Sequence, residues 1–219
     1  MKNLRLRLIT SCILIPLSIC VLLLGGIYLS FFSLIILFIG INEILKVFKN
    51  FKSKIFLIIT LIISLYALNF LANENYRSAY MLYFAILVCI GSDVGGFVFG
   101  KIIKGKKLTR ISPNKTISGV FGAYIFSFLF LFIFNTYFLK TVHESINVSL
   151  IYGINEILVT IIFSTLAQLG DLSISYLKRI DKVKDTGKIF PGHGGLFDRI
   201  DSLMFVIIVS YIFYLFIKI

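Results

Sequence analysis

Apolar stretches of close to twenty residues follow one another along most of the chain, with short polar segments between them. That length lets an α-helix cross about 30 Å of hydrocarbon with its backbone hydrogen bonds satisfied internally. The pattern therefore predicts an all-α fold, a polytopic transmembrane helical bundle of about seven spans. The expected spans are Leu8–Leu24, Ile27–Leu45, Ile55–Leu71, Ala79–Phe99, Ile117–Leu139, Ile157–Leu177 and Leu203–Ile217, of which the last could begin near Ile200.

The first apolar stretch has two interpretations. Lys2, Arg5 and Arg7 precede it, as in a signal peptide, but no A-x-A-like cleavage site follows, which favours a retained span. Gly25-Gly26 predicts a tight turn into the second span. Because no Pro/Ser-rich linker or internal repeat divides the chain, we expect residues 1–219 to form a single integral membrane domain.

Composition supports the membrane class. Hydrophobic residues make up 58% of the chain and charged residues 15%, so a soluble domain of this size would expose too much apolar surface. The three cysteines, Cys12, Cys20 and Cys89, lie in apolar runs at spacings that match no metal site or disulfide framework. We expect them to be small core residues.

The basic residues are distributed unevenly over the two sides of the predicted bundle. The net charge is +12, and with seven spans 19 of the 22 lysines and arginines fall on the side of the N-terminus. Only Arg77, Lys140 and Lys218 fall on the other side. Because positively charged loops face the cytoplasm, we expect the N-terminus and the basic loops there. This orientation explains the basic charge without a nucleic-acid partner.

Carboxylates gather on the same side as the basic loops. Asp93 and Asp171 lie within or at the edge of apolar segments, where an acid is costly unless it is paired or coordinates a ligand. Carboxylates that hold a metal and cations that neutralise phosphate oxygens are typical of a site for magnesium-bound polyphosphate. The acids expected on this side are Asp93, Asp171, Asp181, Asp185, Asp198 and Asp201, with Glu43 near it.

The segment from Gln168 to Ser202 concentrates the candidate chemistry. Asp171, Ser175 and Lys178 are spaced i, i+4, i+7 and therefore line one face of the sixth predicted helix. Asp198 and Asp201 are spaced i, i+3 at the start of the seventh. Between the two helices, the glycines in the run FPGHGG suit a loop that wraps phosphate with backbone N–H groups.

Most of these features have a structural interpretation as well. The basic stretch around Lys182 is more often a loop that contacts anionic headgroups. Asp198 could be a helix N-cap, and His193 alone is more often a loop or packing residue than a catalyst. Asp171 differs, because a lone acid in an apolar helix is functional by default.

Two stretches resemble the bacterial CDP-diacylglycerol synthase (phosphatidate cytidylyltransferase) family. The first, SYLKRIDKVKDTGKIFPGHGGLFDRID from Ser175 to Asp201, is similar to the family signature at every fixed position. The second, SDVGGFVFGKIIKGKKLTRISPNKTISGVFGA from Ser92 to Ala123, also looks like the family. The resemblance is weak before Tyr80, and the chain is shorter than typical members, so we expect it to lack some of their N-terminal helices.

The resemblance implies transfer of CMP from CTP to phosphatidate, giving CDP-diacylglycerol and pyrophosphate, in a bacterial inner (plasma) membrane. It implies Mg²⁺ held by Asp171, Asp198 and Asp201, and it leaves a monovalent co-ion and a homodimer open. For His193 we expect a structural or phosphate-orienting role. The implied catalytic residues are Asp171, Asp198, Asp201, Asp185, Lys178 and Arg179. The implied substrate-binding residues are Ser175, Lys184, Arg199, His193, Gly194, Gly195, Ser112, Asn114 and Lys115.

Other functions remain to be weighed against this one. A polyprenol or phytol kinase, or a CDP-archaeol synthase, would share a polytopic fold and a metal–polyphosphate site. The complete GHGG-x-x-DR-x-D motif favours the synthase. An anion transporter would also have buried acids and basic mouths, but here the acids gather at one membrane face and no inverted repeats are visible.

The charge partition gives a test of topology. With single cysteines introduced into a cysteine-free background, we expect positions 106 and 184 to react with an impermeant reagent from the cytoplasmic side. Position 74 should react only from the opposite side, because it lies in the sparsely charged face. Labelling of positions 74 and 184 from the same side would refute the predicted topology.

Overall fold

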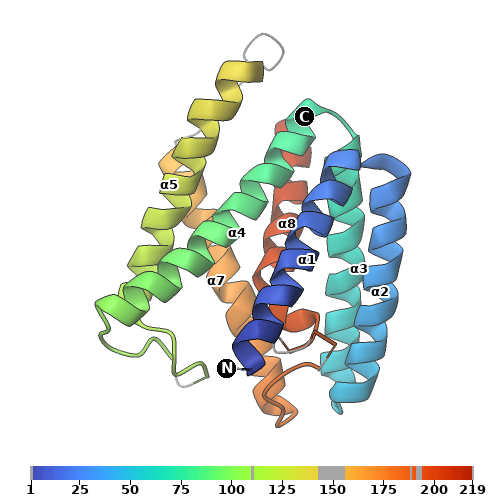
Figure 1. Cartoon of the computed structure of the whole chain (residues 1–219), viewed down its shortest axis with the longest axis vertical. Coiled ribbons are helices and arrows are strands. Elements are labelled where there is room, and N and C mark those ends of the chain that lie inside the picture. The colour runs from blue at the N-terminus through green and yellow to red at the C-terminus, as the bar shows by residue number, and fades with distance from the viewer. Residues whose placement is uncertain (1, 110, 143–155, 188, 191–193, 219) are drawn as a thin grey trace.

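The computed structural model describes residues 2–109, 111–142, 156–187, 189–190 and 194–218. Every regular element among these residues is a helix, apart from two isolated β-bridges. Successive helices run in alternating directions, so α1 begins at one end of the bundle and α8 finishes at the other (Figure 1). The helices are α1 (Lys2–Leu24), α2 (Gly26–Val47), α3 (Phe51–Asn73), α4 (Tyr76–Ile102), α5 (Ile117–Val142), α7 (Glu156–Ile180) and α8 (Phe197–Lys218).

Each predicted span corresponds to one of these helices, which confirms the all-α fold. The Gly25-Gly26 turn is also confirmed, since both residues have positive φ, of 58° and 49°. The helix α8 begins at Phe197, a few residues before the apolar stretch expected from Leu203 or near Ile200, and its first turns include Asp198 and Asp201, as their spacing predicts. The charged residues of its first turn interrupt the apolar pattern, and one of them, Asp198, is paired with Lys178 in the folded protein.

The apolar helices have the dimensions of a membrane protein. Six of them, α2, α3, α4, α5, α7 and α8, are long and apolar enough to cross a membrane, and the described apolar part of α1, Thr10–Leu24, is shorter. Large apolar side chains are exposed along the helices, as lipid-facing surfaces require. The expectation that the cysteines are core residues holds for Cys89 and is wrong for Cys12 and Cys20, which are exposed.

Helices α4 and α5 approach each other through glycines. A Cβ added at Gly95 would lie 2.1 Å from the carbonyl oxygen of Gly122, and one added at Gly91 would lie 2.6 Å from the Cα of Ser127. The Ser127 hydroxyl donates to the carbonyl of Val88 at 3.1 Å. Small residues and interhelical hydrogen bonds are the usual means of helix association in membranes, because lipid provides no hydrophobic driving force between helices.

The basic loops lie together at one end of the bundle. The turn between α2 and α3, the segment 103–116 before α5 and the connection between α7 and α8 all lie at the end where α1 starts (Figure 1). The turn between α3 and α4, which contains Glu74, lies at the opposite end. The loops that the charge pattern assigns to one side of the membrane therefore lie at the same end of the bundle.

The glycine contact between α4 and α5 gives a matched pair of variants. Gly95→Ala must push the two helices apart, and we expect it to lower stability by about 1–3 kcal/mol, as overpacking does. Gly96→Ala adds the same methyl group one residue later, where only the Gly119 carbonyl lies within reach, at 3.8 Å. Thermal unfolding in detergent should therefore show a lower Tm for Gly95→Ala alone. Equal Tm values for the two variants would contradict this packing.

Candidate active site

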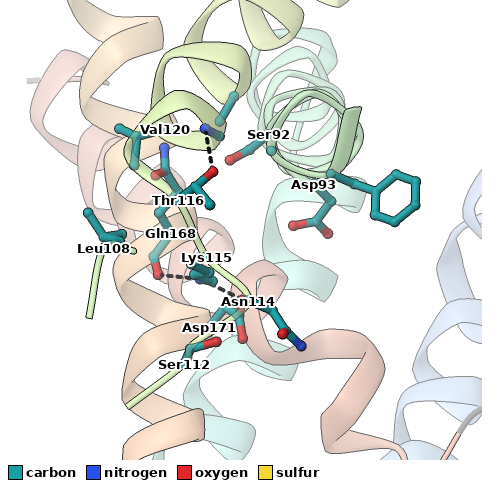
Figure 2. Close-up of a pocket in the computed structure, with 14 residues that line it drawn as sticks. Ser92, Asp93, Leu108, Ser112, Asn114, Lys115, Thr116, Val120, Gln168 and Asp171 are labelled. Carbon is teal, nitrogen blue, oxygen red and sulfur yellow. Dashed lines mark hydrogen bonds and ion pairs between the residues drawn. The ribbon is translucent and has the colours of Figure 1, made fainter. Parts of the chain in front are cut away.

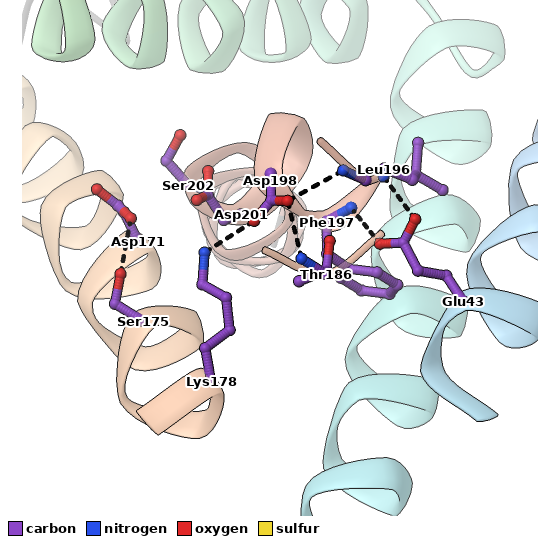
Figure 3. Close-up of polar contacts among 11 residues, drawn as sticks. Glu43, Asp171, Ser175, Lys178, Thr186, Leu196, Phe197, Asp198, Asp201 and Ser202 are labelled. Carbon is purple, nitrogen blue, oxygen red and sulfur yellow. Dashed lines mark hydrogen bonds and ion pairs between the residues drawn. The ribbon is translucent and has the colours of Figure 1, made fainter. Parts of the chain in front are cut away.

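The start of α8 is held by a carboxylate from outside the helix. Glu43 on α2 is 3% exposed, and its carboxylate accepts from the backbone N–H groups of Leu196 at 2.7 Å and Phe197 at 3.1 Å (Figure 3). The first N–H groups of a helix have no partner within it, so they need such acceptors. A negative charge also interacts favourably with the positive end of the helix dipole.

Asp198 joins α7, α8 and the segment between them. Its Oδ1 is paired with the Lys178 ammonium at 2.9 Å, and its Oδ2 accepts from the backbone N–H groups of Thr186 at 2.9 Å and Gly195 at 3.0 Å (Figure 3). The side chains of Lys178 and Asp198 are only 13% and 11% exposed. Because α8 begins at Phe197, the alternative in which Asp198 is the N-cap residue is wrong.

Asp171 joins α7 to the segment that precedes α5. Its Oδ2 lies 2.6 Å from the Lys115 ammonium, which also donates to the carbonyl of Gln168 at 3.3 Å. The Ser175 hydroxyl, one turn further along α7, lies 3.4 Å from Oδ1 of Asp171. The ion pair is about a quarter exposed, so it is accessible to a ligand. Through it, the two sequence motifs, 92–123 and 168–202, meet in one place.

A cavity of about 280 Å³ opens beside this pair (Figure 2). Three elements contribute polar groups to it, namely α4, the segment before α5, and α7. Asp93 on α4 is exposed and lies in the cavity wall. The polar residues that line it are Ser92, Asp93, Ser112, Asn114, Lys115, Thr116, Gln168 and Asp171.

Other predicted residues lie at the surface of the protein. Four of them, Arg179, Lys184, Asp185 and Arg199, are exposed. Arg179 donates through Nε to the carbonyl of Ile111 at 3.4 Å, which again ties the end of α7 to the segment before α5.

The glycine-rich run is only partly described. Gly194 has a φ of 91°, and a Cβ added there would lie 2.6 Å from Oδ2 of Asp198. The N–H of Gly195 donates to that same oxygen. Both glycines therefore surround a carboxylate in this structure, and their binding of phosphate stays a prediction. His193 lies outside the described residues.

The acids of α7 and α8 have the donor chemistry that magnesium prefers. Asp171 and Asp201 lie at the same level on these two helices (Figure 3), and Asp201 is within electrostatic reach of both Asp171 and Asp93. Hard oxygen donors with an excess of negative charge suit a divalent cation. Asp198 fits less well, because Lys178 and two N–H groups occupy both of its oxygens. Among the described residues, no three His, Cys, Asp or Glu side chains converge closely enough to hold a metal ion.

Sequence reasoning assigned no role to three residues that build this site. Glu43 caps α8, Thr186 donates its N–H to Asp198, and Gln168 lines the cavity. The one available signal was an acid within the apolar stretch of α2, which indicates a paired or functional carboxylate. The sequence could not identify its partner, which lies more than 150 residues away along the chain.

Comparison with known proteins agrees with this geometry. The model of the cytidylyltransferase family matches residues 48–217, which include both ion pairs and the cavity. Three curated relatives, each named phosphatidate cytidylyltransferase, illustrate the similarity. The protein from Staphylococcus epidermidis (strain RP62A) is 43% identical over 125 residues, which are 57% of this chain and 45% of the relative.

The other two relatives give similar values. The protein from Staphylococcus haemolyticus is 43% identical over 139 residues, covering 63% of this chain and 50% of the relative. The protein from Staphylococcus aureus (strain COL) is 44% identical over 129 residues, covering 58% and 46%. The chain spans about half the length of the curated relatives it matches. Because the family model covers well over half of the chain, the chain belongs to the cytidylyltransferase family.

Proposed function

We propose that this chain transfers CMP from CTP to phosphatidate, giving CDP-diacylglycerol and pyrophosphate. The observation that carries the proposal is the Lys115–Asp171 ion pair, which joins the two family-like motifs beside a polar cavity. The printed name of the relatives, phosphatidate cytidylyltransferase, supplies the substrate class.

The reaction needs alignment and charge neutralisation more than a protein nucleophile. A phosphate oxygen of phosphatidate attacks the α-phosphorus of CTP, and the bond from that phosphorus to the oxygen bridging to the β-phosphate breaks, which releases pyrophosphate. The attacking phosphate is already anionic near pH 7, so no strong general base is required. Lys115 and Lys178 are held in place by Asp171 and Asp198, and each ammonium has further N–H groups to offer to phosphate oxygens.

Magnesium fits the oxygen donors of Asp171 and Asp201, and ligation by Asp198 would require Lys178 to release Oδ1. When bound, the ion would neutralise CTP oxygens and stabilise the pyrophosphate leaving group.

The position of the site suits a water-soluble nucleotide and a membrane lipid. The site lies at the end of the bundle where the basic loops gather, so CTP can approach from water while acyl tails remain in hydrocarbon. We assign this end to the cytoplasmic side of a bacterial inner membrane, with the start of α1 on the same side.

Position-specific labelling of CTP gives the direct test. With purified protein, phosphatidate and magnesium, label from [α-³²P]CTP should appear in lipid and label from [γ-³²P]CTP in pyrophosphate. Chelation of magnesium should abolish both signals. A lipid alcohol that acquires the γ label would instead identify a kinase, and the absence of any lipid product would refute the proposal.

Two aspartate variants separate catalysis from folding. Asp171→Asn removes a charge from a partly exposed pair, so turnover should fall at least about 10²-fold with little change in Tm. Asp198→Asn also weakens charge-assisted bonds to Lys178 and two backbone N–H groups, so a loss of about 1–3 kcal/mol in stability should accompany its loss of turnover.

The exposed cation Lys184 gives the control for that measurement. Lys184→Ala should leave Tm within error of the original protein. Near-normal turnover in both aspartate variants would remove these residues from the site.

A further inference from the structure

Glu43 lies outside the residues that the family model matches, yet it contacts the start of the helix that carries Asp198 and Asp201. The matched region begins at residue 48, whereas Glu43 is in the last turns of α2. The carboxylate accepts from two successive N–H groups, those of Leu196 and Phe197. Both bonds are buried, so water cannot replace them.

The chain packs closely around this carboxylate on two sides. A Cβ added at Gly195 would lie 2.5 Å from Oε1 of Glu43, and one added at Gly187 would lie 2.9 Å from Oε2. Residues 187 and 195 belong to the connection between α7 and α8, so Glu43 touches both parts of that connection. The neighbouring N–H of Gly195 is bonded to Asp198. Of the three successive N–H groups of residues 195 to 197, the first therefore donates to Asp198 and the other two donate to Glu43.

This arrangement couples the placement of Asp198 to α2. If the Glu43 carboxylate moves, the first turn of α8 loses two of its fixed N–H groups, and Asp198 and Asp201 move with that turn. Displacement of reacting groups by about 1 Å can cost about 10²-fold in rate. A side chain that fixes this turn therefore acts on the chemistry without touching the substrate.

We propose that Glu43 is a positioning residue for the transfer reaction, which holds the first turn of α8 so that Asp198 and Asp201 face α7. The inference rests on the proposed function for its kinetic part and on the hydrogen bonds of Glu43 for its structural part. Nothing in the family match includes this residue.

Asp181 provides a matched control within the same chain. It is also buried, at 8% exposed, and its Oδ1 accepts from two backbone N–H groups, of Lys49 at 2.9 Å and Asn50 at 2.7 Å. It anchors the turn between α2 and α3 rather than the start of α8. Asp181→Ala removes two part-buried bonds between a carboxylate and backbone N–H groups and so reports how much activity is lost through destabilisation alone.

The decisive experiment compares Glu43→Gln with Asp181→Ala. The glutamine keeps the size of the side chain, but its NH₂ group faces an N–H donor, so one bond is lost. We expect kcat of Glu43→Gln to fall about 10²-fold with KM for CTP within about 3-fold of the original, because the lysines proposed to bind phosphates lie on other elements. Asp181→Ala should keep kcat within about 3-fold at an equal or larger loss of Tm.

Hydrogen exchange separates this inference from the proposed function. In Glu43→Gln the amides of Leu196 and Phe197 should exchange about tenfold faster or more, which can be measured whatever reaction the protein catalyses. If the original protein transfers no CMP, the proposed function fails. If the amides of Leu196 and Phe197 exchange at the same rate in Glu43→Gln as in the original protein, Glu43 does not anchor the start of α8.

Two kinetic outcomes would also overturn the proposal. In the first, Asp181→Ala and Glu43→Gln lose the same amount of Tm and also the same amount of kcat. In the second, Glu43→Gln keeps a kcat within about 3-fold of the original. If Glu43→Gln does not fold, Gly187→Ala displaces the carboxylate by a few tenths of an ångström instead. A folded Gly187→Ala variant should then lose about tenfold in kcat, and full activity in it would count against the role of Glu43.

Discussion

The unpaired N–H groups at the start of α8 impose the constraint on which the rest of the site depends. A helix that begins near hydrocarbon cannot leave these donors without acceptors, and two carboxylates supply them. Glu43 comes from α2, and Asp198 is part of α8 itself. Since Asp198 is also paired with Lys178 of α7, one set of hydrogen bonds fixes α2, α7 and α8 together. Asp198, an acid of the family-like signature, is therefore also an acid that the fold needs.

The same interactions prepare the cations of the site. Lys115 and Lys178 each have an aspartate partner from another element, so their long side chains are ordered before any phosphate arrives. This lowers the entropic cost of binding an anion. The acids Asp93, Asp171 and Asp201 nevertheless lie within electrostatic reach of one another, which would repel a free nucleotide. A nucleotide that carried magnesium would meet less of this repulsion.

The sequence predicted the helices well because length and apolarity alone decide whether a helix can span a membrane. From helical spacing and the family signature it also placed Asp171 and Asp198 in one site. In the structure Asp171 is paired with Lys115 and Asp198 with Lys178, and a shared site stays a prediction. It could not predict that Cys12 and Cys20 face outward, because lipid-facing and core positions are equally apolar. The role of Glu43 could not be predicted for a different reason. It depends on hydrogen bonds between residues far apart in the chain.

The glycines of α4 and α5 connect the packing of the bundle to the shape of the cavity. Gly95 and Gly122 set how closely the two helices approach. Gly96 directly follows Gly95, Gly119 lies about one turn before Gly122, and both line the cavity. Asp93 on α4 and Lys115 at the entrance to α5 line the same cavity. Any side chain that separates α4 from α5 must also move Asp93 away from Lys115. Close packing in the membrane and the dimensions of the polar site are therefore a single property of this helix pair.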